Sequence, residues 1–415
     1  MSFSTHLSTA RSYRALFAIA LLPLLASCND GYDNYCYNCY AMPAEISRGL
    51  VAGDFNAGGF PSIIATSALE PDQGQALDNL KVYLSTAAGA YAAPVYVADG
   101  FDPLYLASAD LNGDGLADVV SASFSTGTLA VFLNDKSSPG TLSAPLVLSS
   151  PGASQVAIGD MNGDGMPDLI SADYGVSLFV QTSPGAFAAP ISLYSGGANW
   201  VAVGDLNGDG APDVVLTDIV GVKILLHTGA ASSTTFAAPV SVFTQTPNAN
   251  VAGANIVAIA DVNNDGANDL VITDPGPTGG TAPTVNILLQ VSPGTFAAPV
   301  SYAITAGDLP QSIVVTDVDG DGRPDIIIGG RQSVTVLLQN HAPAAAGTFM
   351  AATSYAAQGA YQIAVADING DHNPDIVVGN GVTNPVVNGV QTTHPGVLLQ
   401  SATSPGTFGA VQDLP

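Results

Sequence analysis

Short apolar runs separated by turn-forming residues follow one another along the chain from about residue 47 onward. In one stretch, the run QVAIG at 155–159 precedes a polar segment and DLISA at 168–172 follows it. A later run often ends in LLQ, as at 288–290, and a turn then leads to FAAPV or FAAPI, as at 187–191. Short runs rich in Val and Ile and bounded by Gly, Pro and Asn are typical of β-strands. No amphipathic helical pattern is found after residue 30, so the pattern predicts an all-β chain.

The polar segment between two of these runs recurs as a nonapeptide. Its clearest copy is DLNGDGLAD at 110–118; the others begin at Asp160, Asp205, Asp261, Asp317 and Asp367, and a degenerate copy begins at Asp54. The starts are 45 to 56 residues apart, and four apolar runs fall in each interval. Four antiparallel strands per repeat of about 50 residues is the pattern of a propeller blade. Seven copies therefore predict a seven-bladed β-propeller of four-stranded antiparallel blades, with an Asp-rich loop between the first and second strands of each blade.

The runs that follow the Asp-rich loops are apolar on both faces, as expected of strands packed between two neighbouring blades. The chain has a single Trp, which disfavours blades of the WD type. A Phe recurs after the third run of five repeats and is expected to fill the space between blades: Phe187, Phe236, Phe296, Phe349 and Phe408.

The nonapeptide places oxygen-bearing side chains at alternate positions. In the copy at 110–118 they are Asp110, Asn112, Asp114 and Asp118, and the carbonyl of Leu116 adds a fifth oxygen. Such a ring of hard oxygens suits Ca²⁺, and the Gly at position six allows a sharp turn. The intact copies therefore predict about six Ca²⁺ ions. The corresponding ligands in the other copies are Asp160, Asn162, Asp164, Met166 and Asp168; Asp205, Asn207, Asp209, Ala211 and Asp213; Asp261, Asn263, Asp265, Ala267 and Asp269; Asp317, Asp319, Asp321, Arg323 and Asp325; and Asp367, Asn369, Asp371, Asn373 and Asp375.

The copies differ in ways that bear on metal binding. Asp319 stands where the other intact copies have Asn, and His372 replaces the Gly of position six, where a positive φ is strained for other residues. The first copy has Gly58 and Ser62 in place of Asp and is expected to bind no metal. The EF-hand is excluded, because no helices flank the loops and position twelve lacks Glu. Metal-free Asx turns remain the alternative, although three carboxylates within nine residues would repel one another without a cation.

This repeating unit resembles the FG-GAP/VCBS repeats of integrin α-subunit propellers and of many bacterial surface proteins, over about residues 47–415. The resemblance implies the propeller fold and the calcium loops. It implies no single activity, because such propellers serve in adhesion, lectin-like binding, catalysis and scaffolding. In integrin-like propellers the metal loops lie on one face, and the loops that lead into the first strands lie on the other.

On that second face, the residue five positions before each metal-loop Asp is expected at the mouth of the central channel. Aromatic and amide side chains in these places are suited to stacking on a sugar and hydrogen-bonding it. The alternative is that the rings plug the channel. The predicted ligand-binding residues are Tyr105, Gln155, Trp200 and Gln362, together with Tyr361 beside Gln362.

The charge of the chain is strongly acidic, with 34 Asp and Glu against 8 Lys and Arg. Only Glu45 and Glu70 are Glu, so the acidity consists almost wholly of short carboxylates, which suit turns and calcium loops. The formal net charge of −26 argues against nucleic acid as a partner.

The N-terminus has the features of an export signal. Two Arg precede a short apolar run, and the sequence LASC that ends it resembles the bacterial lipobox. We therefore expect residues 1–27 to be a lipoprotein signal peptide, Cys28 to be acylated, and 28–46 to be a tether that leads into the propeller at 47–415. Asn29 in place of Asp favours the outer membrane or cell surface. The remaining pair, Cys36 and Cys39, is expected to form a local disulfide, with a redox pair or half a zinc site as alternatives.

The catalytic inventory is thin, because no nucleophile elbow, phosphate loop or zinc motif appears. Three functions therefore stand: a surface binding or adhesion module for a glycan or protein, a scaffold without a small ligand, and a carbohydrate-active lyase or hydrolase. A carboxylate pair for glycoside hydrolysis is the chemistry that would favour the third. The enzyme is the least favoured of the three.

Overall fold

A computed structural model describes residues 45–46, 48–69, 79–228, 233–244, 256–276, 282–304, 308–341, 346–379, 386–387, 390–391 and 394–414. The described residues belong to one compact unit, 42–415. The expectations for Cys28, Cys36 and Cys39 lie outside the described residues. Among the residues that are described there is no helix, and hence none long and apolar enough to cross a membrane.

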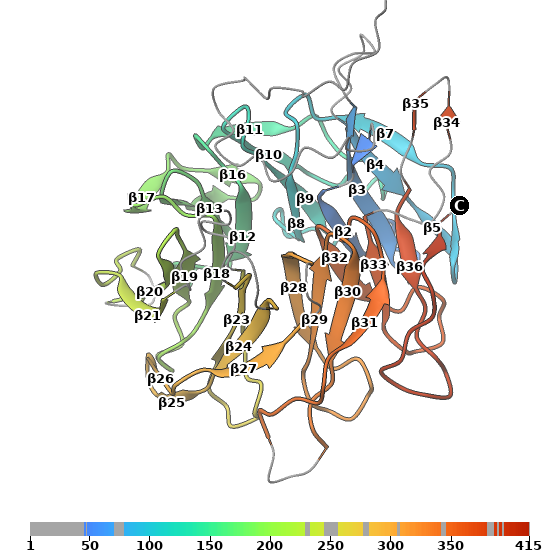
Figure 1. The fold of residues 1–415 in the computed structure, drawn as a ribbon. Coiled ribbons are helices and arrows are strands. Elements are labelled where there is room, and N and C mark those ends of the chain that lie inside the picture. The colour runs from blue at the N-terminus through green and yellow to red at the C-terminus, as the bar shows by residue number, and fades with distance from the viewer. Residues whose placement is uncertain are drawn as a thin grey trace, which may run out of the picture. The chain divides into compact units, whose positions relative to one another are not determined.

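Seven antiparallel sheets of four strands follow one another along the chain, which confirms the predicted seven-bladed propeller (Figure 1). The first three are β2 (Leu50–Gly53), β3 (Ser62–Leu69), β4 (Asn79–Tyr83) and β7 (Val95–Ala98); β8 (Tyr105–Ala109), β9 (Asp118–Ser123), β10 (Thr128–Phe132) and β11 (Leu146–Ser149); and β12 (Gln155–Gly159), β13 (Asp168–Ala172), β14 (Val176–Phe179) and β17 (Ile191–Tyr194). The next two are β18 (Trp200–Gly204), β19 (Asp213–Thr217), β20 (Gly221–Leu225) and β21 (Val240–Thr244); and β22 (Val257–Ala260), β23 (Asp269–Asp274), β24 (Thr284–Leu288) and β27 (Val300–Ala303). The last two are β28 (Pro310–Thr316), β29 (Asp325–Gly330), β30 (Ser333–Leu337) and β31 (Thr353–Ala356); and β32 (Ile363–Ala366), β33 (Asp375–Val378), β36 (Gly396–Leu398) and β37 (Gln412–Asp413).

Several short strands supplement the blades. β1 (Glu45–Ile46) pairs with β3 beyond β2, so the inner strand of blade one is split in two. Small hairpins join strands three and four of some blades, and a further one lies within blade seven. They are β5 (Ser85–Ala87) with β6 (Ala90–Tyr91), β15 (Gln181–Ser183) with β16 (Ala186–Phe187), β25 (Gln290–Ser292) with β26 (Thr295–Phe296), and β34 (Val386–Val387) with β35 (Val390–Gln391).

The ring closes through its inner strands. Each of β2, β8, β12, β18, β22, β28 and β32 contacts the inner strand of both neighbouring blades, and β2 of blade one meets β32 of blade seven. No strand is exchanged between the first and last blades, because each of these sheets is built from consecutive strands. Closure therefore rests on packing between blades and on hydrogen bonds such as the one from Gly89 N of blade one to Ile368 O of blade seven, at 2.7 Å.

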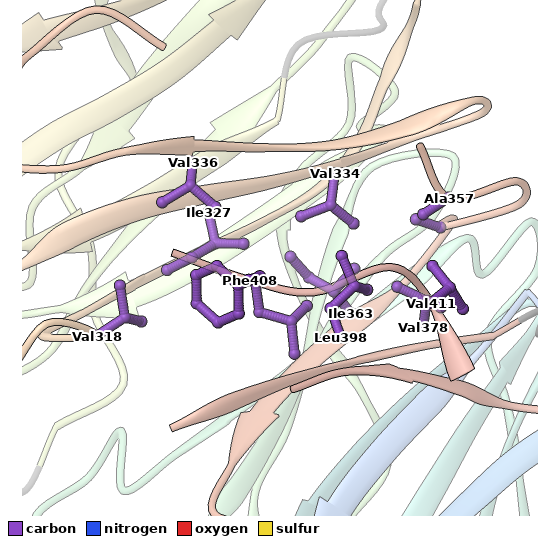
Figure 2. Packing of buried hydrophobic residues seen from close by; sticks show 12 residues of the cluster. Val318, Ile327, Val334, Val336, Ala357, Ile363, Val378, Leu398, Phe408 and Val411 are labelled. Carbon is purple, nitrogen blue, oxygen red and sulfur yellow. The ribbon is translucent and has the colours of Figure 1, made fainter. Parts of the chain in front are cut away.

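The hydrophobic core consists of seven clusters, and each lies between two adjacent blades. Figure 2 shows the cluster between blades six and seven, in which Phe408 packs beside Ile327 and Leu398. The second strands of blades two to seven are buried along their whole length, because both of their faces meet a neighbouring blade. All five repeated Phe pack in these clusters, which confirms their predicted place.

Candidate metal-binding loops

The Asp-rich loops join the inner strand to the second strand of each blade, as the repeat pattern predicts. In blade two, β8 ends at Ala109, the loop begins at Asp110, and the Asp at position nine, Asp118, is the first residue of β9. Ala109 is the pairing partner of Asp118, so the loop is closed by the last pair of the hairpin. The same register holds at all six intact copies.

The carboxylate at position one folds each loop around itself. Asp110 accepts hydrogen bonds from the backbone N–H of Gly113 at 2.7 Å and Asp114 at 3.1 Å through Oδ1, and from Gly115 at 2.8 Å through Oδ2. Asn112 Oδ1 also accepts from Asp114 N at 2.9 Å. These are Asx turns, the predicted alternative to metal loops, yet carboxylate and amide oxygens keep further lone pairs for a cation. The two descriptions are therefore compatible.

Position six requires a left-handed backbone. Gly115 has φ 93°, and His372 at the same position of loop seven has φ 68°. The strain predicted for His372 follows, because a side chain at positive φ crowds the following peptide. Asn264 at position four of loop five also adopts positive φ, at 58°, where other loops have Gly.

The position-nine carboxylate is fully buried and ties the loop to the blade. Asp168 Oδ2 accepts from Met161 N at 2.9 Å, and its Oδ1 accepts from Gln181 N at 2.7 Å, at the end of the third strand. All six intact copies repeat this pair of bonds. In blade one Ser62 takes the place of Asp, and its Oγ accepts from Ser85 N at 3.0 Å. Position nine thus has a structural role in addition to any role as a metal ligand.

Burial shifts the acidity of these carboxyls. Burial raises the pKa of Asp168, Asp269 and Asp325 to about 6; the two backbone donors lower it, and the other carboxylates of the loop raise it further. The pKa values of Asp118, Asp213 and Asp375 are raised for the same reasons. A bound cation would offset both unfavourable effects, because it supplies the missing positive charge.

These pKa shifts predict that the free energy of unfolding changes with pH in opposite directions in EDTA and in calcium. The folded protein binds protons at Asp168, Asp269 and Asp325 near pH 6, whereas an unfolded chain binds them near its ordinary pKa of about 3.9. The free energy of unfolding in EDTA should therefore rise as the pH falls from about 8 to about 5. In calcium it should fall over the same range, because protons compete with the ion. Calorimetry across this range in both buffers checks the prediction, and a steady fall on acidification in EDTA would contradict it.

The donor set fits Ca²⁺ in its chemistry. Each intact loop offers at least three carboxylates and, at position three, a further amide or carboxylate oxygen, all of them hard ligands. Of the carboxylates, loop one retains only Asp54, which accepts from Gly58 N and Gly59 N at 2.9 and 3.0 Å. The first copy therefore keeps the turn without the crowded negative charge that calls for a cation.

A second contact, which was not predicted from the sequence, joins most of the loops to the next blade. The Gln at the end of a third strand donates from Nε2 to the position-two carbonyl of the preceding blade's loop. The pairs are Gln181 with Leu111 at 2.9 Å, Gln290 with Leu206 at 2.8 Å, Gln339 with Val262 at 2.5 Å and Gln400 with Val318 at 2.6 Å. Asn134 makes the equivalent bond to Phe55 at 2.7 Å, and His227 stands in this place in blade four. The recurrent LLQ was the visible signal of this contact.

The opposite end of the inner strands holds the predicted ligand-binding residues. Trp200 of blade four donates from Nε1 to Val257 O at 3.0 Å and meets the ring of Tyr105 edge to face, with centroids 5.3 Å apart. Gln155 accepts from Val201 N at 3.0 Å, and Gln362 accepts from Leu50 N at 3.0 Å. Both Gln side chains are buried in these interblade bonds.

Tyr105, Trp200 and Tyr361 are partly exposed. The aromatic residues are therefore the part of the predicted ligand face that is open to solvent.

Comparisons with known proteins agree with this architecture. One solved structure of similar fold is an Agrocybe aegerita lectin that recognises non-reducing terminal N-acetylglucosamine, with 19% identity, a TM-score of 0.50, and 74% of this chain and 80% of the lectin chain covered. Another is a putative 6-phosphogluconolactonase from Bacteroides fragilis, with 15% identity, a TM-score of 0.53, and 75% of this chain and 85% of that chain covered. At these identities the likeness shows the fold. No match was found among curated proteins. The FG-GAP-like repeat matches residues 110–171, 160–216, 261–328 and 317–378, which together make up more than half of the chain. This chain therefore belongs to the FG-GAP-like repeat family, as a seven-bladed β-propeller.

Proposed function

We propose that this propeller is a calcium-stabilised binding module that is exported, lipid-anchored and displayed at the outer membrane or cell surface, where it recognises a glycan or a protein. The observation that carries the proposal is that the two faces of the propeller present different side chains. Six near-identical acidic loops gather on one face, and exposed aromatic and apolar side chains gather on the other. The first face would hold about six Ca²⁺ ions, and the second would hold the ligand.

The proposed ligand face extends outward from the channel mouth. Tyr105 pairs with Ala122 near the end of β9, so the turn between β9 and β10 lies at the same end of blade two as the channel-mouth ring. Phe124 in that turn meets Tyr174 of blade three edge to face, with centroids 6.3 Å apart. Tyr174 is 63% exposed, and Ile219 in the corresponding turn of blade four is 64% exposed. Exposed rings beside a polar surface commonly mark recognition sites for sugars or proteins.

Substitutions on this face should weaken ligand binding without unfolding the protein. We expect Tyr174→Ala and Trp200→Ala each to reduce binding by about tenfold or more, since a stacked ring contributes roughly 1–2 kcal/mol. Val291→Ala is the matched control. Val291 is as exposed (64%) as Tyr174 (63%), but it lies beside the metal loops. The measurement is a glycan array that includes N-acetylglucosamine-terminated glycans, since a propeller of similar fold binds that sugar. Unchanged binding in both variants would contradict the proposed face; unfolding of Trp200→Ala alone would favour a channel plug.

The same purified protein distinguishes the other functions. Depolymerisation of a polysaccharide would indicate a lyase or hydrolase. Absence of both glycan binding and degradation, with stable capture of one specific protein, would indicate a scaffold. The FG-GAP-like repeats themselves are consistent with a binding or scaffold module.

Export and anchoring have a direct test. We expect the mature protein from bacterial membranes to begin at Cys28 and to carry acyl chains, because LASC resembles a lipobox. Mass spectrometry of the N-terminal peptide measures both. Cys28→Ala should leave an unacylated precursor, whereas Cys36→Ala should leave acylation intact. An unmodified Cys28 or an intact Met1 in the membrane fraction would refute the anchor.

A further inference from the structure

Loop six differs from the other metal loops in its donors. Asp319 supplies a carboxylate at position three, where the other intact loops have Asn. In the part of the chain that the structure describes, three His, Cys or acidic ligand atoms come within 4.8 Å of one another only here, in the groups Asp317, Asp319, Asp325 and Asp319, Asp321, His341. Asp319 belongs to both groups, and the second group contains a nitrogen donor from outside the loop.

The ring of His341 stands between two carboxylates in an arrangement suited to a metal ligand. Its Nδ1 lies 2.8 Å from Asp321 Oδ2, at hydrogen-bond distance, and its Nε2 lies 3.7 Å from Asp319 Oδ2, too far for a hydrogen bond. Two ligand atoms that each lie about 2.1 Å from one tetrahedral ion are about 3.4 Å apart. A metal-bound imidazole commonly donates its second N–H to a carboxylate, which fixes the ring. Asp321 is placed for that role.

The backbone that carries His341 is held against loop six. Arg323 of the loop donates from Nη1 to Asn340 O at 2.5 Å, and Gln339 N donates to Asp325 Oδ1 at 2.8 Å. The Asp319 side chain is only 5% exposed, whereas His341 is 57% exposed and open to an ion that arrives from solvent. The site is thus anchored on the protein side and accessible on the other.

We propose that loop six and His341 form a mixed nitrogen–oxygen site that prefers a Zn²⁺-class dication to Ca²⁺. This inference rests on the proposal that the Asp loops bind cations. Asp319 and His341 Nε2 supply two ligands, solvent completes the shell on the exposed side, and Asp321 orients the imidazole. Imidazole favours Zn²⁺ and its neighbours in the transition series, whereas Ca²⁺ takes only oxygen ligands.

His372 provides a matched comparison. It lies within a metal loop, at position six of loop seven, but its Nδ1 approaches a single carboxylate, Asp367, at 3.8 Å, and its side chain is 97% exposed. A plain histidine–aspartate ion pair at the surface would behave alike at the two places. Selective zinc binding requires the convergence found only around His341 in the described residues.

The test is the zinc content of the full chain in excess calcium. Stripped protein is titrated with Zn²⁺ alone and then in 1 mM Ca²⁺ at about the extracellular level, and both metals are counted per chain. We expect one zinc that calcium does not displace, with its affinity reduced about tenfold or more in His341→Ala and Asp319→Asn and unchanged in His372→Ala. Co²⁺ as a spectroscopic substitute should show nitrogen ligation that His341→Ala removes. Cys36 and Cys39 are retained in every variant, so any zinc they bind cancels in the comparison.

The zinc difference between the parent chain and His341→Ala decides this inference. Equal zinc affinity in the two, or displacement of all zinc by calcium, overturns the mixed site. The calcium count is read separately in the same samples. Its absence would defeat the calcium proposal for the other loops, whatever the outcome at His341.

Discussion

EDTA is expected to lower the melting temperature of the protein by about 3–10 °C relative to 1 mM calcium. Extracellular calcium modules bind with dissociation constants on the order of 10⁻⁴–10⁻³ M, so each site adds about 0.4–1.4 kcal/mol at 1 mM calcium. Six independent sites would add about 2–8 kcal/mol to the free energy of unfolding. For a domain of about 370 residues, 1 kcal/mol corresponds to roughly 1.3 °C.

The fold adds a structural contribution to this loss of stability, beyond the free energy of binding the ions. The position-two carbonyl of a loop accepts the amide of the next blade's Gln, as Val318 accepts Gln400. A loop that loosens without its ion would therefore disturb an interblade contact as well as its own blade. Because each blade packs on its neighbours and the ring closes by packing and hydrogen bonds between blades, we expect this loosening to be felt around the ring.

Calorimetry with EDTA, calcium and magnesium measures the effect, together with a metal count per chain. Magnesium should restore little of the lost stability, because it demands a tighter octahedral shell than these loops provide. A matched choline chloride addition controls for ionic strength. An unchanged melting temperature in EDTA, with no calcium bound in its absence, would contradict the calcium assignment and leave the Asx turns as the complete description of the loops.

The blade count could be predicted because the nonapeptide reports the topology of every repeat. Its Asp at position one follows the inner strand and its Asp at position nine starts the second, so seven copies fix seven hairpins at once. The degenerate copy at Asp54 still marked blade one, since its turn needs only one carboxylate and Gly residues. The repeated Phe could be placed between blades because a large apolar residue after the third strand has no other core to enter.

Contacts between blades could not be read from the same pattern. Gln362 bonds Leu50 in blade one and Leu106 in blade two, which are 312 and 256 residues away, and no local pattern encodes such a partner. For the same reason Gln155 and Gln362 were predicted as ligand-binding residues, although their amides are engaged across the ring. The approach of His341 to Asp319 was also invisible, because a separation of 22 residues spans a whole hairpin.

Replacing Asp168 by Ala should destabilise the protein by about 2–6 kcal/mol in calcium. The carboxylate is fully buried and is the acceptor for Met161 N and Gln181 N, at 2.9 and 2.7 Å. Its loss leaves two buried N–H groups without an acceptor, and each such group costs about 1–3 kcal/mol. Urea unfolding at neutral pH, in calcium and in EDTA, measures the change in free energy.

The control is Asp164→Asn in the same loop. Asp164 is exposed, and its Oδ1 accepts from Met166 N at 2.8 Å, a bond that the Asn oxygen can keep. This variant should lose about 0.4–1.4 kcal/mol in calcium, the contribution of one site, and nothing in EDTA. Asp168→Ala, in contrast, should remain destabilised in EDTA, because its two backbone bonds do not depend on the ion.

The loss at Asp168 in EDTA should nevertheless be smaller than in calcium. Burial raises the pKa of this carboxyl to about 6, so at neutral pH its charge is unfavourable when no cation is present, and Ala removes that charge. Asp168→Ser should recover part of the lost stability relative to Asp168→Ala. Ser62 occupies the same position in blade one, and its Oγ accepts a hydrogen bond from Ser85 N. If Asp168→Ala matched the parent chain in EDTA, position nine would act through the metal alone and its two backbone bonds would contribute nothing to the fold.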